Sequence, residues 1–113
     1  MHEMSIAQNL IAIVEEEMAK NNAAVLRAVR VNIGEMSGIV PEALKTCFEI
    51  IIANSNMNGA KFKMDITPLI GGCRECKKEF KIKEYNFLCP ECASTDIDVI
   101  SGREMSIVEI EVD

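Results

Sequence analysis

Residues 73–92 read CRECKKEFKIKEYNFLCPEC, which places four cysteines in two C-x₂-C pairs separated by twelve residues. Each pair can turn two sulfurs toward one ion, and the intervening residues are long enough for a hairpin that returns the second pair to the first. Cys73, Cys76, Cys89 and Cys92 therefore predict one closed tetrahedral site with Zn²⁺ as the expected metal. Structural disulfides, a rubredoxin-like iron site and two redox C-x-x-C motifs are the alternatives.

The composition of the 113-residue chain indicates a small protein with a modest core. Hydrophobic residues make up 49% of it, yet Trp is absent and there are one Tyr and four Phe, so aliphatic side chains must form the core. No apolar stretch approaches the ~20 residues of a membrane span, and the N-terminus lacks a basic signal region. We therefore expect a cytoplasmic protein with reduced, metal-bound cysteines and no membrane partner. The net charge of −6 argues against a nucleic-acid partner.

The hydrophobic periodicity outside the cysteine segment predicts two helices and three strands. Apolar residues at helical spacing favour helices over about residues 4–20 and over residues 41–57, the second beginning at a proline. Ser5 and Gln8 have the form of a capping box for the first helix. Period-two alternation predicts strands over residues 24–33, 61–67 and 105–112.

The cysteine segment interrupts this pattern and does not follow it. We therefore predict an α+β fold, in which residues 1–70 and 102–113 form a small α/β domain with two helices and a three-stranded sheet, and residues 71–101 form an inserted zinc-ribbon lobe. The lobe has few apolar residues, so its folding should depend on metal. Its basic run, Arg74 to Lys83, is interpreted as a solvated face, with an acidic protein partner as the alternative. Flanking glycines leave both a monomer and a swapped homodimer open.

His2 is the single histidine of the chain and follows Met1 directly. The Met1 amine, the deprotonated amide of His2 and its imidazole Nδ1 would close a five-membered and then a six-membered chelate ring, and the amide of Glu3 offers a fourth nitrogen. Four nitrogens in a plane suit Ni²⁺ or Cu²⁺ and not the tetrahedral preference of zinc. Taken alone, a histidine without a metal role is the alternative interpretation of this position.

Three further segments accompany the cysteine spacing: MHEMS at residues 1–5, GEMSGI at residues 34–39, and an ending from GREM to IEV over residues 102–112. In this order they resemble the HypA family, the nickel metallochaperones of hydrogenase maturation. The resemblance implies nickel binding at His2 and Glu3, and structural zinc at the four cysteines. Some members add a histidine from the zinc lobe to the nickel site, and this chain has none there.

The resemblance also implies partners and a role. The expected partners are the GTPase HypB, the large subunit of [NiFe] hydrogenase and, in members that also serve urease, urease accessory proteins. No enzymatic activity is expected, because the chain has one histidine, no nucleotide-binding glycine-rich loop and a zinc shell filled by four sulfurs. The alternative function is a zinc-ribbon module that binds protein or nucleic acid without nickel.

Overall fold

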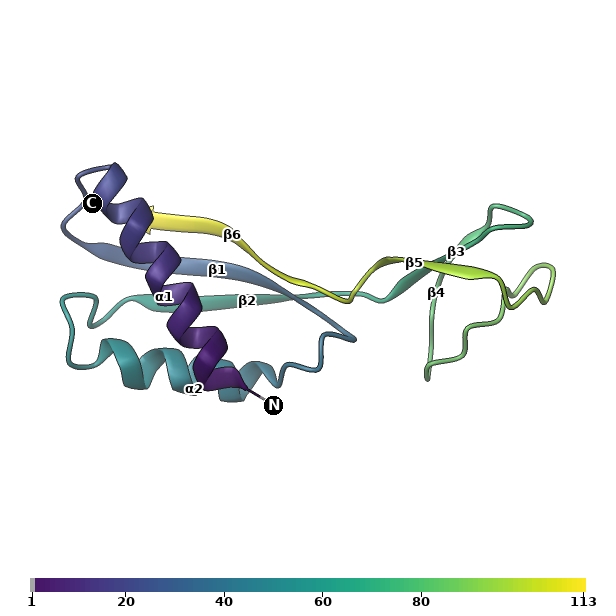
Figure 1. The fold of residues 1–113 in the computed structure, drawn as a ribbon, viewed down its shortest axis with the longest axis horizontal. Helices are drawn as coiled ribbons and strands as arrows, with labels where there is room; N and C mark the ends of the chain where they lie inside the picture. The colour runs from purple at the N-terminus through teal and green to yellow at the C-terminus, as the bar shows by residue number, and fades with distance from the viewer. Residues whose placement is uncertain (1) are drawn as a thin grey trace.

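The computed structural model describes residues 2–113, so the Met1 amine that is predicted to bind nickel lies outside the described residues. The molecule is elongated, with principal extents of 54 × 26 × 17 Å (Figure 1). Neither helix is long and apolar enough to cross a membrane. In chain order the elements are α1 (Glu3–Lys20), β1 (Leu26–Gly34), α2 (Pro41–Ile52), β2 (Lys61–Thr67), β3 (Ile70–Cys73), β4 (Glu79–Lys81), β5 (Ile97–Ser101) and β6 (Met105–Val112).

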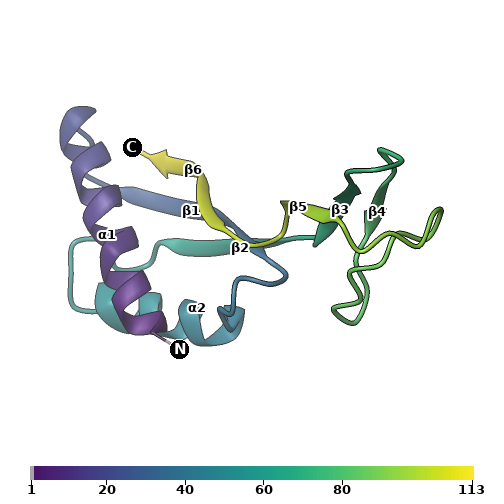
Figure 2. The same cartoon turned by 45° about the vertical axis from the view of Figure 1, so that its right-hand side comes forward.

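Two three-stranded sheets lie at opposite ends of the long axis. In the first, the order is β2-β1-β6, with β1 parallel to β2 and antiparallel to β6. The parallel pair needs a crossover, which α2 supplies, and both helices lie on one face of this sheet (Figures 1 and 2). The second sheet, β4-β3-β5, is antiparallel and lies in the chain between β2 and β6. The predicted α+β fold is therefore confirmed.

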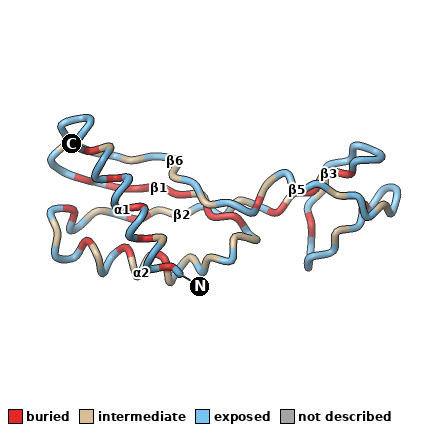
Figure 3. The backbone as a smooth tube through the Cα atoms, in the orientation of Figure 1, coloured by how far each residue is buried: buried red, intermediate tan, exposed pale blue. Residues whose placement is uncertain are grey.

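The hydrophobic core lies between the helices and the first sheet. Figure 3 shows the buried positions gathered along α1, β1 and α2. Phe48 of α2 is completely buried and stacks on Phe62 of β2 with a ring centroid distance of 4.7 Å. Cys47, the odd cysteine, is half-buried and packs against this core, as its place on the apolar stripe of α2 predicts. No residue of the segment 70–101 belongs to the core.

The first helix agrees with its expected range within one residue, whereas the second ends earlier than expected. α1 begins at Glu3 with His2 as its N-cap, so the capping box predicted from Ser5 and Gln8 is wrong, because both residues lie inside the helix. α2 ends at Ile52, before the expected break at residue 58. There the Ser55 hydroxyl donates to the carbonyl of Ile52 (2.9 Å), and such local side-chain bonds compete with the helix ladder.

Residues 34–36, at the end of β1, contact both connections between the two sheets, residues 68–69 and 102–104. The N–H of Met36 donates to the carbonyl of Gly102 (2.7 Å), and the N–H of Leu69 donates to the Glu35 carboxylate (2.8 Å). A Cβ atom on Gly34 would lie 2.4 Å from the carbonyl oxygen of Gly102, so the backbones meet where a side chain has no room. Gly102 itself has a φ of 104°.

Gly102→Ala is expected to destabilise the protein by about 3 kcal/mol, because the new Cβ would lie 2.6 Å from the Leu69 Cα and the positive φ would be strained as well. Urea unfolding of the zinc-loaded protein measures this difference. Gly59→Ala is the matched control, since Gly59 has a φ of 91° but nothing within 4 Å of the added Cβ. Its cost should be about 1 kcal/mol, from backbone strain alone. Equal losses in the two variants would contradict the steric argument.

Candidate metal centres

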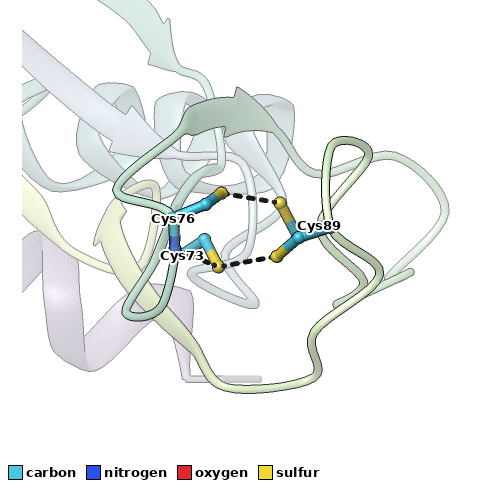
Figure 4. A group of neighbouring side chains, drawn as sticks. Cys73, Cys76 and Cys89 are labelled. Atoms are coloured by element: carbon cyan, nitrogen blue, oxygen red, sulfur yellow. Dashed lines mark hydrogen bonds between the residues drawn. The ribbon is translucent and has the colours of Figure 1, made fainter.

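The four cysteines converge in the second sheet. Their sulfurs all lie within 4.8 Å of one another, and the Sγ atoms of Cys73 and Cys92 and those of Cys76 and Cys89 are each 3.5 Å apart (Figure 4). Four sulfurs about 2.3 Å from a tetrahedral ion would lie about 3.8 Å from one another. The arrangement thus fits one ion after small adjustments. The four cysteines are free thiols and not disulfides.

The two cysteine pairs lie in turns of the same design. In the first, the N–H of Cys73 donates to the carbonyl of Lys78 (2.9 Å), and the N–H of Lys77 donates back to the carbonyl of Cys73 (3.0 Å). The equivalent bonds of the second turn, both 2.9 Å, run from Cys89 N–H to Ser94 O and from Ala93 N–H to Cys89 O. In each turn the first cysteine is buried and the second is exposed.

The turns close through residues with left-handed backbone conformations. Lys77 has a φ of 67° and Ala93 has a φ of 61°, each four residues after the first cysteine of its pair. Glycine or asparagine is the usual sequence signal for such a conformation, and neither residue occupies these two positions. The sequence reasoning therefore missed these two turn residues, and the equivalent main-chain bonds in the structure reveal them.

The electrostatics of the cluster favour a cation at its centre. The N–H of Cys76, which points to the Cys73 sulfur at 3.5 Å, is the main cause that lowers the pKa of Cys73 to about 7. The Ser94 N–H lowers the pKa of Cys92, but the neighbouring Cys73 sulfur, burial and the two other sulfurs together outweigh it and raise that pKa to about 12. Four thiolates cannot gather here without a compensating charge, which a divalent ion supplies. The sulfur donors suit zinc.

Part of the basic run is neutralised inside the second sheet and its turns. Arg74 forms ion pairs with Asp96 (3.5 Å) and Asp98 (2.5 Å), and Lys78 lies 3.6 Å from Glu91. All of these side chains are about half exposed or more, so the pairs contribute little stability. For Arg74 and Lys78, these contacts support the interpretation of a solvated face.

The predicted nickel residues lie at the N-terminus of α1. Figures 1 and 2 show this terminus beside α2 and away from the cysteine turns. His2 is exposed, and its carbonyl accepts the first intrahelical hydrogen bond, from the N–H of Ile6 (3.0 Å). The N–H groups of residues 3–5 precede that bond and have no partner within the helix. The structure therefore does not bring the two predicted sites together.

The Glu3 carboxylate has a structural contact of its own. It accepts a hydrogen bond from the N–H of Val40, the N-cap residue of α2, at 3.2 Å, and Glu3 is 9% exposed. This bond joins the beginnings of the two helices, whereas the N-cap residue of α1 makes no side-chain cap bond. The sequence reasoning considered Glu3 as a nickel residue and missed this contact.

Glu3 also provides a pH-dependent test of this contact. The Val40 N–H holds the pKa of Glu3 below its usual value of 4.5. A carboxyl group with a lowered folded-state pKa contributes stability that is fully present above the unfolded-state pKa and is lost as the pH falls through the folded-state pKa. The melting temperature of Glu3→Gln should therefore lie below that of the unsubstituted protein near neutral pH, and the gap should narrow below pH 4.5. Glu15→Gln, an exposed change on the same helix, is the control, and a constant gap for Glu3→Gln would argue against the contact.

Comparison with known proteins links the chain to one family. A family model described as hydrogenase/urease nickel incorporation, metallochaperone, hypA matches residues 1–112. The hydrogenase maturation factor HypA of Solidesulfovibrio magneticus is 41% identical over 117 positions, and that of Geotalea uraniireducens is 36% identical over 113 positions. Each alignment covers 100% of both chains.

Solved structures show the same likeness. The solution structure of the Ni metallochaperone HypA from Helicobacter pylori has a TM-score of 0.70 at 28% identity, covering 99% of this chain and 97% of the other. A second solution structure of a HypA protein has a TM-score of 0.76 at 29% identity, covering 99% and 96% of the two chains. The similarity therefore includes the sheet with two helices and the cysteine-bearing sheet alike.

Proposed function

The chain belongs to the HypA family of hydrogenase/urease nickel incorporation metallochaperones, and on this premise we propose that it binds Ni²⁺ at its N-terminus and delivers the ion during maturation of [NiFe] hydrogenase. The observation that carries the proposal is the exposed His2 at the first turn of α1. The main-chain N–H groups at this helix start precede the first i→i+4 hydrogen bond of the helix. Nickel is the cargo of this site.

The nickel site uses nitrogen donors from three consecutive residues. The Met1 amine, the amides of His2 and Glu3 and the His2 imidazole form the planar set that Ni²⁺ prefers over Zn²⁺. The two deprotonated amides balance the two positive charges of Ni²⁺, so the bound site is neutral overall and its formation releases two protons. A terminal site open on one side lets the ligands of a recipient protein approach and replace these donors one at a time.

The four cysteines hold Zn²⁺ as a structural ion in this proposal. The ion would bind Cys73, Cys76, Cys89 and Cys92 and close the two equivalent turns on one another, without an open position for water. Residues 71–101 then form a zinc-binding domain, and residues 1–70 with 102–113 form the nickel-binding domain. A metallochaperone with this division needs no catalytic residues.

The proposed partners follow from the family. The GTPase HypB would couple its nucleotide cycle to nickel transfer in the cytoplasm, and the large subunit of [NiFe] hydrogenase would receive the ion. Urease accessory proteins are further recipients if the chain also serves urease. Family membership in hydrogenase/urease nickel incorporation supports both routes.

The test is the metal content of the protein after nickel loading and desalting. Tag-free protein is compared with a version extended by two residues before Met1, which removes the free amine from the chelate. We expect about one nickel per chain in the tag-free protein alone, and about one zinc per chain in both. Equal nickel in the two proteins, or none in either, would leave the alternative of a zinc-stapled interaction module.

A further inference from the structure

The free edge of β2 is the starting point. β2 is the outer strand of the order β2-β1-β6, and the carbonyl of Thr67 accepts a hydrogen bond from Glu35 N–H (2.9 Å), at the end of β1. Main-chain groups alternate in direction along a strand, so those of Phe62, Met64 and Ile66 face away from β1. Within residues 2–113, no hydrogen bond from a loop or side chain reaches these three residues. Their N–H and C=O groups form an open ladder.

A groove with positive charge lies beside this edge. Its lining residues come from α2, from residues 58–60 and from the beginning of β2, it has a volume of about 550 Å³, and Lys45, Lys61 and Lys63 are among the residues around it. Glu49 is the one acidic residue among its lining residues. We call Lys45, Lys61 and Lys63 the lysine groove.

The charge of the lysine groove is unusual for this protein. The chain carries a net charge of −6, yet three of the four lysines outside residues 70–101 line this one groove. Lys63 lies 3.9 Å from Glu111, at the limit of an ion pair, and Lys45 and Lys61 form no ion pair within the described part of the chain. The positive charge is therefore available to an acidic partner.

The side chains of β2 also indicate what pattern a partner strand needs. Lys61 and Lys63 lie on the sheet face that the helices leave uncovered, since they are level with Ala28 and Arg30 of β1. On the helical face, Phe62 is buried in the floor of the groove and Ile66 is 54% exposed at the other end of the strand. A strand added to this edge would therefore face lysines with one row of side chains and apolar atoms with the other.

We propose that the β2 edge binds an extended, acidic segment of another protein by strand addition. The segment alternates acidic and apolar residues: its carboxylates face Lys61 and Lys63, and its main chain pairs with Phe62, Met64 and Ile66. Without such a partner, the role of these lysines would be limited to protecting the edge strand β2 from pairing with unrelated strands. A second copy of this chain is a poorer occupant of the β2 edge. If its acidic β6 edge paired with β2, the two copies would be joined head to tail, and one β2 edge and one β6 edge of the pair would remain free.

The test uses zinc-loaded, full-length protein labelled with ¹⁵N and the blocked peptide Glu-Val-Glu-Val-Glu-Val. Binding should be saturable, with the largest amide shifts at Phe62, Met64 and Ile66. The same peptide with Gln in place of Glu should bind about tenfold more weakly, and the difference should shrink at high salt. An absence of saturable binding, or shifts spread evenly over the protein, would overturn the proposal.

Two variants separate charge from main-chain pairing. Lys61→Gln with Lys63→Gln should weaken binding of the acidic peptide by about five- to tenfold. Lys81→Gln with Lys83→Gln, the same change at the same spacing at and just after the end of β4, should change it less than about twofold. Met64→Pro removes an outward N–H and should abolish binding of both peptides. Equal effects of the two lysine pairs would overturn the proposal, and so would sedimentation that reveals self-association through this edge.

Discussion

His2→Ala is expected to lower the affinity for Ni²⁺ by at least about 1000-fold, because the change removes the imidazole and with it the proposed chelate ring that would hold the metal against the amide nitrogens. Backbone amides are very weak acids, and they lose their protons only where a planar metal is already anchored on both sides. Loss of one anchor therefore weakens the whole set of donors and not one bond alone. Isothermal titration of tag-free protein measures the affinity, and the absorption band of planar nickel reports the geometry.

The control keeps one histidine in the chain at a different position. In His2→Ala combined with Gln8→His, the new imidazole is exposed on α1 but has no terminal amine in its chelate. Zinc content and melting temperature should match the unsubstituted protein in both variants, since His2 makes no side-chain cap bond. Return of tight nickel binding in the double variant would show that any exposed histidine near the helix start suffices, and would contradict the terminal chelate.

The second large effect concerns zinc. Cys89→Ser, or removal of zinc by a chelator, is expected to unfold residues 70–101 and to leave the sheet β2-β1-β6 and its helices folded. The reason is the distribution of the core, because the buried core cluster contains no residue of this segment. Apart from the cysteines, the buried side chains in and beside the segment are chiefly Leu69 and Ile82. Structural zinc sites contribute about 10–16 kcal/mol, far more than two aliphatic side chains.

Amide spectra measure this prediction residue by residue. Signals of residues 70–101 should lose their dispersion, while those of α1, β1 and α2 should stay in place. Cys47→Ser is the matched control, because Cys47 packs against the hydrophobic core between the helices and the first sheet and is not part of the sulfur cluster. The zinc content of this variant should remain at about one per chain. Dispersed signals from residues 70–101 without zinc would contradict both the metal dependence and the proposed division into two domains.

Local patterns in the sequence predicted the elements accurately where no distant contact competes. β2 and β6 occupy the residues expected from alternation, 61–67 and 105–112, and α2 begins at Pro41. The strand expected over residues 24–33 runs over 26–34, because the N–H groups of Ala24 and Val25 bond outside it, to the carbonyl of Asp113. Side-chain periodicity depends on neighbours a few residues away, so it can be recognised directly in the sequence.

For the two metal sites, too, the sequence predicted some features and missed others. The spacing of the cysteines alone predicted one shared site, and the structure brings all four sulfurs together. The left-handed residues Lys77 and Ala93 carried no sequence signal, because the hydrogen bonds of the two turns impose their conformation. His2 as a nickel ligand stays a prediction from its position in the chain and from the family resemblance.

The sequence by itself thus determined the two helices, the strands β1, β2 and β6 and the cysteine cluster, but not the individual strands β3, β4 and β5 of the cysteine-bearing sheet. Tertiary structure alone decided the hydrogen bond between Glu3 and Val40, the contact of Gly34 with Gly102, and the open edge of β2 beside its lysines. Each of these features joins residues that are more than thirty positions apart, or depends on which strand lies at the edge of the sheet. Such contacts form only when the whole chain packs its core, so no local pattern encodes them.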